Sequence, residues 1–248
     1  MTRASANPPE AVATGAGART APAPVAQPCP LCASRAPWFH ADARRPYYRC
    51  PHCHLIHVPA AWHVDPATEK AQYDLHDNRP DDPRYRRFLG RAADALRQRL
   101  PAPARGLDFG SGPGPTLSLM LQEAGYDVAL YDPWYAPRDD ALATRYDFIT
   151  ATEVFEHLRA PAAAIDRVLQ CLHPGGWLIV MTKRAHGDRH SFARWHYTTD
   201  PTHVAFFATA TFTWLADRYS LGLEIAGDDV VALQRPHHAA AGTPLDPC

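Results

Sequence analysis

The chain has 248 residues, 46% of them hydrophobic, and a formal net charge of -1 at pH 7. This length allows one well-buried α/β domain and a small additional module. The near-zero charge argues against a large non-specific nucleic-acid surface, because phosphate binding requires an excess of Lys and Arg. No hydrophobic run is long enough to span a bilayer and none resembles a secretory signal, so we expect a cytoplasmic protein without membrane contact.

Both ends of the chain lack the hydrophobic residues that a folded segment must bury. Residues 1–28 consist largely of Ala, Pro, Gly and Thr, and residues 236–248 have a similar composition. Such segments cannot offset the entropy that is lost on ordering. The sequence therefore predicts a disordered tail over residues 1–28 and a flexible tail over residues 236–248.

Four cysteines near the N-terminus form two C-x-x-C pairs, Cys29 with Cys32 and Cys50 with Cys53. The spacing C-x2-C-x17-C-x2-C is typical of a structural zinc site, in which four thiolates complete a closed tetrahedron. Disulfide bonds are the alternative, but a reducing cytosol disfavours them. Residues 29–58 are therefore predicted to be a zinc-ribbon-like module that its metal stabilises.

Residues 59–104 follow as a helical connector, with one helix expected over residues 85–100. Arginines are concentrated in this region, and the favoured interpretation is a solvated helix face, although a nucleic-acid patch is the alternative. These arginines are Arg84, Arg86, Arg87, Arg91, Arg97, Arg99 and Arg105.

A short apolar strand that begins at Arg105 runs into three alternating glycines, Gly110, Gly112 and Gly114. Glycines at every second position let the backbone turn tightly and approach a ligand closely. The pattern is D-x-G-x-G-x-G, with Asp108 before the first glycine. An acid at this position would repel a pyrophosphate but suits the cationic amino-acid end of S-adenosylmethionine.

The segments after the glycine turn alternate between expected helices and strands. A helix over residues 117–124 leads to a strand that ends in Asp132, where a carboxylate can accept both hydroxyls of a ribose. Little chain separates Asp132 from the next strand, at residue 146, so we expect the third βα unit to be abbreviated. That strand runs into the polar sequence E-V-F-E-H at residues 153–157, and a buried strand follows within residues 172–182.

These motifs together resemble those of the class I S-adenosylmethionine-dependent methyltransferases. The resemblance covers about residues 105–235 and implies an α/β fold with a doubly wound, Rossmann-like methyltransferase sheet behind the small N-terminal zinc ribbon. It implies that S-adenosylmethionine binds to Asp108, Gly110, Gly112, Gly114, Asp132, Thr152 and Glu153.

The E-x-x-E-H sequence with a later histidine resembles the small-RNA 2′-O-methyltransferases and the polyprenyl-dihydroxybenzoate O-methyltransferases. This second resemblance implies a magnesium or manganese site at Glu153, Glu156, His157 and His203. If no metal binds there, His157, His196 or His203 is the candidate general base, and Glu153 remains beside the transferred methyl. The zinc ribbon is a departure from both families and is similar to modules of zinc-bearing rRNA and sugar methyltransferases.

The sequence therefore predicts an S-adenosylmethionine-dependent methyltransferase that acts on an oxygen, nitrogen or carbon nucleophile. The aromatic loop around Trp195 and Tyr197, with Tyr73 from the connector, could close over a substrate and favours a small molecule. The alternatives are RNA or protein docked by the zinc ribbon, and a non-catalytic zinc-ribbon adaptor. The intact glycine turn and Asp132 weigh against the adaptor.

Overall fold

The computed structural model describes residues 25–75 and 78–237. The predicted tails, residues 1–28 and 236–248, lie outside the described residues except for residues 25–28 and 236–237. No helix in the described part of the chain is both long and apolar enough to cross a membrane.

A six-stranded mixed sheet forms the centre of the larger part of the molecule, with the strand order β11-β12-β9-β8-β6-β7. Strands β7, β6, β8 and β9 are parallel, and β12 runs antiparallel to both β9 and β11. This arrangement confirms the predicted α/β, Rossmann-like sheet. The strands are β6 (Arg105–Phe109), β7 (Asp127–Tyr131), β8 (Tyr146–Thr152), β9 (Leu172–Met181), β11 (Gly222–Ile225) and β12 (Val230–Gln234).

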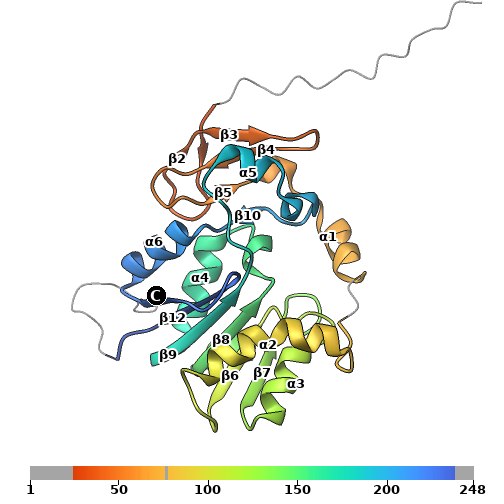
Figure 1. Cartoon of the computed structure of the whole chain (residues 1–248), viewed down its shortest axis with the longest axis vertical. Helices are drawn as coiled ribbons and strands as arrows, with labels where there is room; N and C mark the ends of the chain where they lie inside the picture. The colour runs from red at the N-terminus through yellow and green to blue at the C-terminus, as the bar shows by residue number, and fades with distance from the viewer. Residues whose placement is uncertain (1–24, 76–77, 238–248) are drawn as a thin grey trace, which may run out of the picture.

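Helices cover both faces of this sheet, as Figure 1 shows. On one face lie α2 (Pro83–Arg97) and α3 (Thr116–Glu123), and on the other lie α4 (Pro161–Gln170) and α6 (Thr209–Tyr219). Side chains of β9 alternate between the two layers, because successive residues of a strand point to opposite faces. Leu178 packs on the side of α4 and α6, and Ile179 packs on the side of α2 and α3.

The chain between β7 and β8 holds only the short 3-10 helix η2 (Asp139–Ala143). No strand or α-helix is formed there, which confirms the expected abbreviation of the third βα unit. As a result β7 is an edge strand of the sheet.

The N-terminal module contains two small antiparallel sheets. One pairs β1 (Gln27–Pro28) with β2 (Arg35–Ala36). The other has the order β10-β5-β4-β3, in which β3 (Trp38–Ala41), β4 (Pro46–Arg49) and β5 (Ile56–His57) come from the module. Its fourth strand, β10 (Ala205–Phe206), comes from the C-terminal part of the chain and lies among the module's strands in Figure 1.

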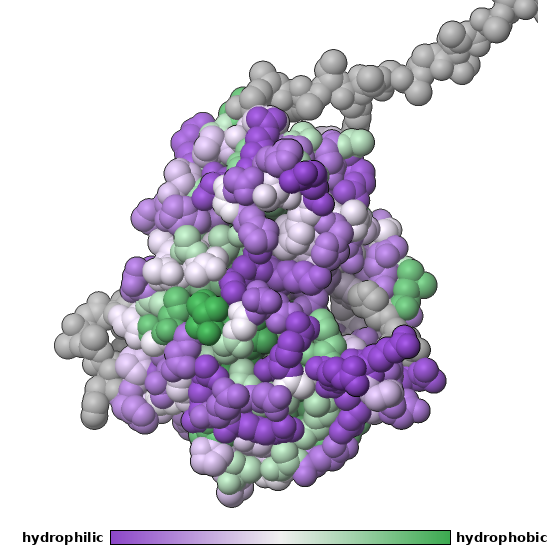
Figure 2. All heavy atoms as spheres, viewed as in Figure 1, coloured by the Kyte–Doolittle hydropathy of each residue, from purple (hydrophilic) through white to green (hydrophobic). Residues whose placement is uncertain are grey.

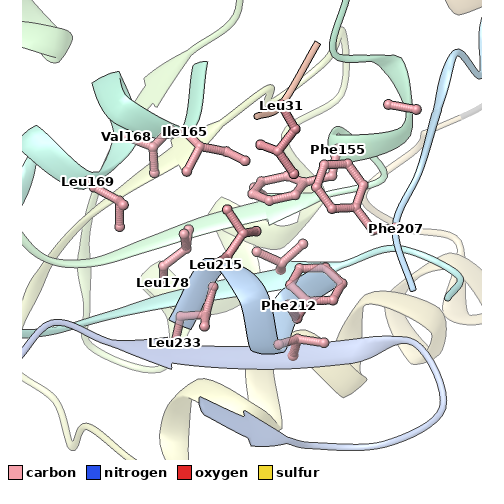
Figure 3. Packing of buried hydrophobic residues seen from close by; sticks show 14 of the residues in the cluster. Leu31, Phe155, Ile165, Val168, Leu169, Leu178, Phe207, Phe212, Leu215 and Leu233 are labelled. Atoms are coloured by element: carbon pink, nitrogen blue, oxygen red, sulfur yellow. The ribbon is translucent and has the colours of Figure 1, made fainter. Parts of the chain in front are cut away.

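The module and the main domain share one hydrophobic core. Leu31, from the first cysteine turn, packs beside Phe155 and Ile165 in Figure 3, and Phe212 and Leu215 of α6 complete this side of the cluster. Because all five side chains are buried, the module is packed onto the α4 and α6 face and is not a separate appendage.

The connector contains η1 (Ala60–Trp62), α1 (Pro66–Tyr73) and α2, and the second of these α-helices corresponds to the helix predicted over residues 85–100. Both α-helices begin with Asp-Pro, where the Asp side chain accepts hydrogen bonds from the first free N–H groups. The remaining elements are α5 (Arg189–Ala193) and the 3-10 helices η3 (Phe155–His157) and η4 (His196–Thr199).

Candidate active site

A cavity of about 800 Å³ opens at the carboxyl ends of β6, β7 and β8. This edge of an open α/β sheet is where ligands bind. The glycine turn and Asp132 line one part of the cavity, and His157, Asp200 and His203 line another. The volume lies within the range of small-molecule sites, so one cavity spans both halves of the predicted site.

The glycine turn has the backbone geometry that a side chain would prevent. Gly110 and Gly112 have φ values of +78° and +63°, in the left-handed region. A Cβ on Gly110 would lie 2.4 Å from Cγ2 of Val154, and one on Gly114 would lie 2.5 Å from the carbonyl oxygen of Asn78. Gly110 and Gly112 line the cavity directly, whereas Gly114 supports Asn78, which lines it.

Asp132 lies directly after β7 and lines the cavity. Its carboxylate accepts hydrogen bonds from the backbone N–H groups of Gly112, Trp134 and Tyr135, at 2.9, 2.8 and 3.0 Å. These contacts fix the acid against the glycine turn. A carboxylate has further lone pairs, which leaves it able to accept from hydroxyl groups of a ligand.

Asp108 differs from what the glycine pattern suggested, because its carboxylate does not line the cavity. It is 2% exposed and accepts hydrogen bonds from the hydroxyls of Ser118 and Thr150, both at 2.8 Å. Burial raises the pKa of Asp108. The residue therefore ties β6 to α3 and β8 beneath the glycine turn.

Thr152 ends β8 and Glu153 follows it, and both line the cavity between its two halves. Glu153 has a φ of 54°, unusual for a residue with a side chain. Its Oε1 is buried and has no hydrogen-bond partner among the described residues. Burial, with the nearby charge of Glu156, raises the pKa of Glu153 to about 8. Local strain and an unpaired carboxyl oxygen are typical of functional sites.

Glu156, His157 and His203 are brought together, with potential ligand atoms that all lie within 4.8 Å of one another. Glu153 does not belong to this group, so the structure assembles three of the four predicted metal ligands. The carboxylate of Glu156 is fully buried and accepts hydrogen bonds from the hydroxyls of Tyr197 and, at 2.9 Å, Thr182. Burial raises the pKa of Glu156.

Backbone carbonyls determine that Nδ1 of each of the two imidazoles carries a proton. Nδ1 of His157 lies 3.3 Å from the carbonyl oxygen of Thr202, and Nδ1 of His203 lies 2.7 Å from that of Tyr197. Because a carbonyl only accepts, Nδ1 of each ring carries a proton, and Nε2 keeps a lone pair whenever the ring is neutral. Burial, followed by the charge of His157, lowers the pKa of His203 and favours its neutral form. Such rings can bind a metal or accept a proton.

His196, the third histidine predicted as a base, lies elsewhere. It is exposed, its Nε2 is 2.9 Å from Nζ of Lys183, and it does not line the cavity. Trp195 and Tyr197 belong to a hydrophobic cluster with the module and also do not line the cavity. Of the three aromatic residues predicted to close over a substrate, only Tyr73 reaches it, and its ring stands edge-on to His157 at 5.2 Å.

The connector supplies further cavity residues that motif reading did not identify. Residues of helix α1 line the cavity, and among them Glu69 forms an ion pair with Arg159 at 2.6 Å. Near the end of this helix, Asp74 accepts a hydrogen bond from Tyr135 at 2.6 Å. A further cavity residue that was not predicted is Asp200, whose Oδ2 lies 3.7 Å from Nε2 of His203. Its only sequence signal was its place in the polar loop ahead of His203.

The four predicted cysteine ligands converge on one point, with all Sγ atoms within 4.8 Å of one another. Sγ atoms of Cys29 and Cys53 are 3.5 Å apart, and those of Cys32 and Cys50 are 3.4 Å apart. A tetrahedral zinc–thiolate site with bonds of about 2.3 Å needs separations of about 3.8 Å. The cluster therefore fits a four-coordinate zinc with no open position.

Comparison with known proteins gives one match to a family. The family described as "Methyltransferase domain" matches residues 82–225. A curated relative, the ubiquinone biosynthesis O-methyltransferase of Serratia proteamaculans (strain 568), is 31% identical over 81 residues. The matched residues cover 33% of this chain and 34% of that relative.

Two solved structures are similar in fold. One is the 1,6-didemethyltoxoflavin-N1-methyltransferase of Burkholderia thailandensis, with a TM-score of 0.49 and 17% identity, covering 80% of this chain and 99% of its own. The other is the N-methyltransferase NodS of Bradyrhizobium japonicum WM9, with a TM-score of 0.43 and 18% identity, covering 68% of this chain and 97% of its own.

Proposed function

This chain belongs to the methyltransferase-domain family of class I S-adenosylmethionine-dependent enzymes, and from that premise we propose that it methylates a hydroxyl oxygen of a small molecule. The observation that carries the proposal is the single cavity, which joins a glycine turn and Asp132 to the imidazoles of His157 and His203. The curated relative is named for O-methylation, which supports oxygen as the nucleophile.

The donor half of the cavity would hold S-adenosylmethionine. Asp132 would accept the ribose hydroxyls, and the backbone of Gly110 and Gly112 would contact the methionine part. Asp108 would act indirectly, because it holds the turn in place from below. The methyl group would emerge beside Thr152 and Glu153, at the boundary with the acceptor half.

Methyl transfer is an in-line displacement, so the protein must mainly align donor and acceptor. We propose that Nε2 of His203 takes the proton of the acceptor hydroxyl while its oxygen attacks the methyl carbon. The carbon–sulfur bond then breaks, and the sulfonium becomes the neutral thioether of S-adenosylhomocysteine. The imidazolium formed on His203 would be stabilised by Asp200, whose Oδ2 lies 3.7 Å away.

Three of the predicted metal ligands also suit a divalent cation, which is the second candidate for activating the acceptor hydroxyl. Glu156, His157 and His203 would hold it, and it would supply positive charge that acidifies the acceptor hydroxyl. The hydrogen bonds from both Nδ1 atoms to carbonyls are the outer contacts that orient metal-binding imidazoles.

The surface charges favour a small molecule over RNA. Most of the arginines around α2 are paired within the protein, and the surface over α2 in Figure 2 is largely hydrophilic. The pairs are Arg86–Glu123, Arg91–Asp229, Arg97–Asp94, Arg99–Glu224 and Arg105–Asp127. Cations neutralised in this way contribute little to phosphate binding.

We also propose that Cys29, Cys32, Cys50 and Cys53 bind one structural zinc. The convergence of the four Sγ atoms supports this assignment. In both C-x-x-C turns the residue after the second cysteine, Ala33 or His54, has a φ of 61°. Its N–H donates to the carbonyl of the first cysteine, so the two halves of the site have matching backbone geometry.

The proposal is tested by calorimetric titration with S-adenosylmethionine, followed by transfer of labelled methyl groups to a panel of phenols and catechols. We expect binding that Asp132→Ala weakens, and transfer to at least one hydroxyl compound. Parallel assays with Mg²⁺ and with EDTA separate the metal route from the His203 route. Transfer to bulk RNA with steep salt dependence, or no donor binding, would refute the small-molecule proposal.

A further inference from the structure

The loop that carries Asp200 and His203 is anchored on the cysteine module, residues 29–58. Beyond His203 the chain enters β10, where Ala205 and Phe206 pair with His57 and Ile56 of the module. The N–H of Val58 donates to the carbonyl of Val204 at 2.9 Å, which extends this pairing by one bond. The acceptor side of the cavity is therefore continuous with a strand, β10, that belongs to the module's sheet.

Arg45 of the module reaches into the same loop from the other side. Its guanidinium is buried, with the residue only 5% exposed. It donates hydrogen bonds to the carbonyl oxygens of Asp200 and Pro201, both at 2.8 Å, and of Thr198 at 3.1 Å. Its Nε donates to the hydroxyl of Tyr47 at 3.1 Å.

This use of a buried arginine is unusual, because Arg45 has no ion-pair partner among the described residues. Burying a cation is costly unless its donors are satisfied. Here the planar guanidinium matches three carbonyls that only a turned backbone can present together. The cation therefore favours this one conformation of residues 198–201 over alternatives in which those carbonyls would point away from the guanidinium.

Hydrogen bonds connect residues 198–201, the turn that Arg45 clamps, to the residues of the active site. Nδ1 of His203 donates to the carbonyl of Tyr197, next to the clamped Thr198. The N–H of Val204 donates to the carbonyl of Glu156 at 2.8 Å. Residues 196–206, hereafter the acceptor loop, are thus held between the module and the E-x-x-E-H turn.

We propose that Arg45 is a positioning residue for the active site, and that the cysteine module builds the acceptor half of the enzyme instead of serving as a separate docking arm. The inference rests on the proposed function, because that function assigns Asp200 and His203 to the acceptor half. Arg45 does not touch the cavity, so it acts only through the acceptor loop.

The matched control is Arg49, which lies on strand β4 of the same module. Its guanidinium donates to the carbonyl of Gly187 at 2.6 Å, outside the acceptor loop. Arg45→Met, Arg45→Lys and Arg49→Met therefore each remove guanidinium–carbonyl bonds of the module, but only the first two reach the acceptor loop. Lysine keeps the charge and can satisfy fewer carbonyls at once.

The experiment compares amide hydrogen exchange, the ¹³Cε1 signal of His203, zinc content and S-adenosylmethionine affinity in the full chain. We expect Arg45→Met to accelerate exchange in peptides of residues 196–206 by tenfold or more and to shift the His203 signal. Arg45→Lys should give a smaller effect and Arg49→Met none. Exchange in residues 105–114, zinc content and donor affinity should stay within twofold of wild type.

Two results would overturn the inference. One is unchanged exchange in residues 196–206 and an unmoved His203 signal in Arg45→Met. The other is parallel loss of zinc and donor binding in both Arg45 variants, which would make Arg45 a general folding residue. A wild-type chain that does not bind S-adenosylmethionine would instead refute the proposed function, and the exchange comparison would still report on the Arg45 clamp.

Discussion

The imidazole rings of His157 and His203 lie with their centroids 4.8 Å apart and their planes at 71° to each other. The two rings come from segments far apart in the chain, and each donates Nδ1–H to a backbone carbonyl of residues 197–202. Both rings therefore line the acceptor side of one cavity. The chemistry of the enzyme should depend on this pair and not on the other histidines.

Substitution of His203 should reduce catalysis without affecting the donor. For His203→Asn we expect a loss of about 10²- to 10⁴-fold in the rate of methyl transfer, the usual contribution of a general base. The dissociation constant of S-adenosylmethionine should change less than twofold. His196→Asn is the control, because His196 is exposed and pairs with Lys183 outside the cavity. An equal loss in both variants would contradict the assignment.

Asp132 and Asp108 should have separable effects although both belong to the predicted donor site. Asp132→Ala removes a cavity carboxylate and should weaken S-adenosylmethionine binding about 10- to 100-fold. Asp108→Ala leaves the hydroxyls of Ser118 and Thr150 unsatisfied and should lower the free energy of unfolding by about 2 kcal/mol. Calorimetry and chemical denaturation distinguish them, and the reverse ranking in donor affinity would count against the indirect role of Asp108.

A methyl group on Gly110 should block the glycine turn. The added Cβ would lie 2.4 Å from Val154, at a φ of +78°. We expect Gly110→Ala to abolish measurable donor binding and to lower the thermal midpoint. Gly90→Ala is the control, because Gly90 lies within α2 with no atom near its Cβ position, and it should raise stability by about 0.5–1 kcal/mol. Donor binding by Gly110→Ala at wild-type affinity would show that the turn does not contact the donor.

Zinc content should depend on one set of cysteines. Elemental analysis of the wild type should give one zinc per chain, and Cys53→Ser should give none and a lower thermal midpoint. Cys171→Ser is the control, because Cys171 is buried but donates to the carbonyl of Leu142, away from the cluster. Zinc loss in both variants, or no zinc in the wild type, would refute the metal assignment.

His57 should make the module sensitive to acid. Burial lowers the pKa of His57 to about 4, and Nε2 has no hydrogen-bond partner among the described residues. The unfolded chain protonates His57 near pH 6.5, whereas the folded chain resists protonation until about pH 4. The stabilisation from the neutral ring is therefore complete above pH 6.5 and is lost as the pH falls toward 4.

The comparison that isolates this effect uses His57→Phe, which keeps a flat ring without a titrating group. Between pH 6.5 and 4 the wild type should lose about 3 kcal/mol more unfolding free energy than the variant. Zinc release in acid affects both proteins and cancels in the difference. Parallel pH profiles would show that His57 is not buried as the structure has it.

Local signals made much of this molecule predictable. Glycines 110 and 112 mark a turn because their positive φ values demand it, and the two C-x-x-C pairs mark the two turns that bring the four cysteines together. The second half of strand β9, residues 177–181, was recognisable because both of its faces are buried, which produces an uninterrupted apolar run.

Other features depend on contacts that no local pattern encodes. Strand β10 has only two residues and exists because β5 offers it an edge. His196 and His203 belong to one polar loop, and only tertiary packing exposes the first and buries the second. The position of Asp108 in the sequence suggested a ligand contact, but its carboxylate accepts hydrogen bonds from Ser118 and Thr150 and does not line the cavity.

The pairing of β5 with β10 also fixes the order in which the chain can fold during synthesis. All four cysteines leave the ribosome early, so their two turns can form while most of the chain is still missing. The edge of β5 stays unpaired until residues 205 and 206 emerge, and closing so long a loop delays this step. The active site therefore becomes complete only after residues 205 and 206, from the C-terminal part of the chain, have paired with the N-terminal module.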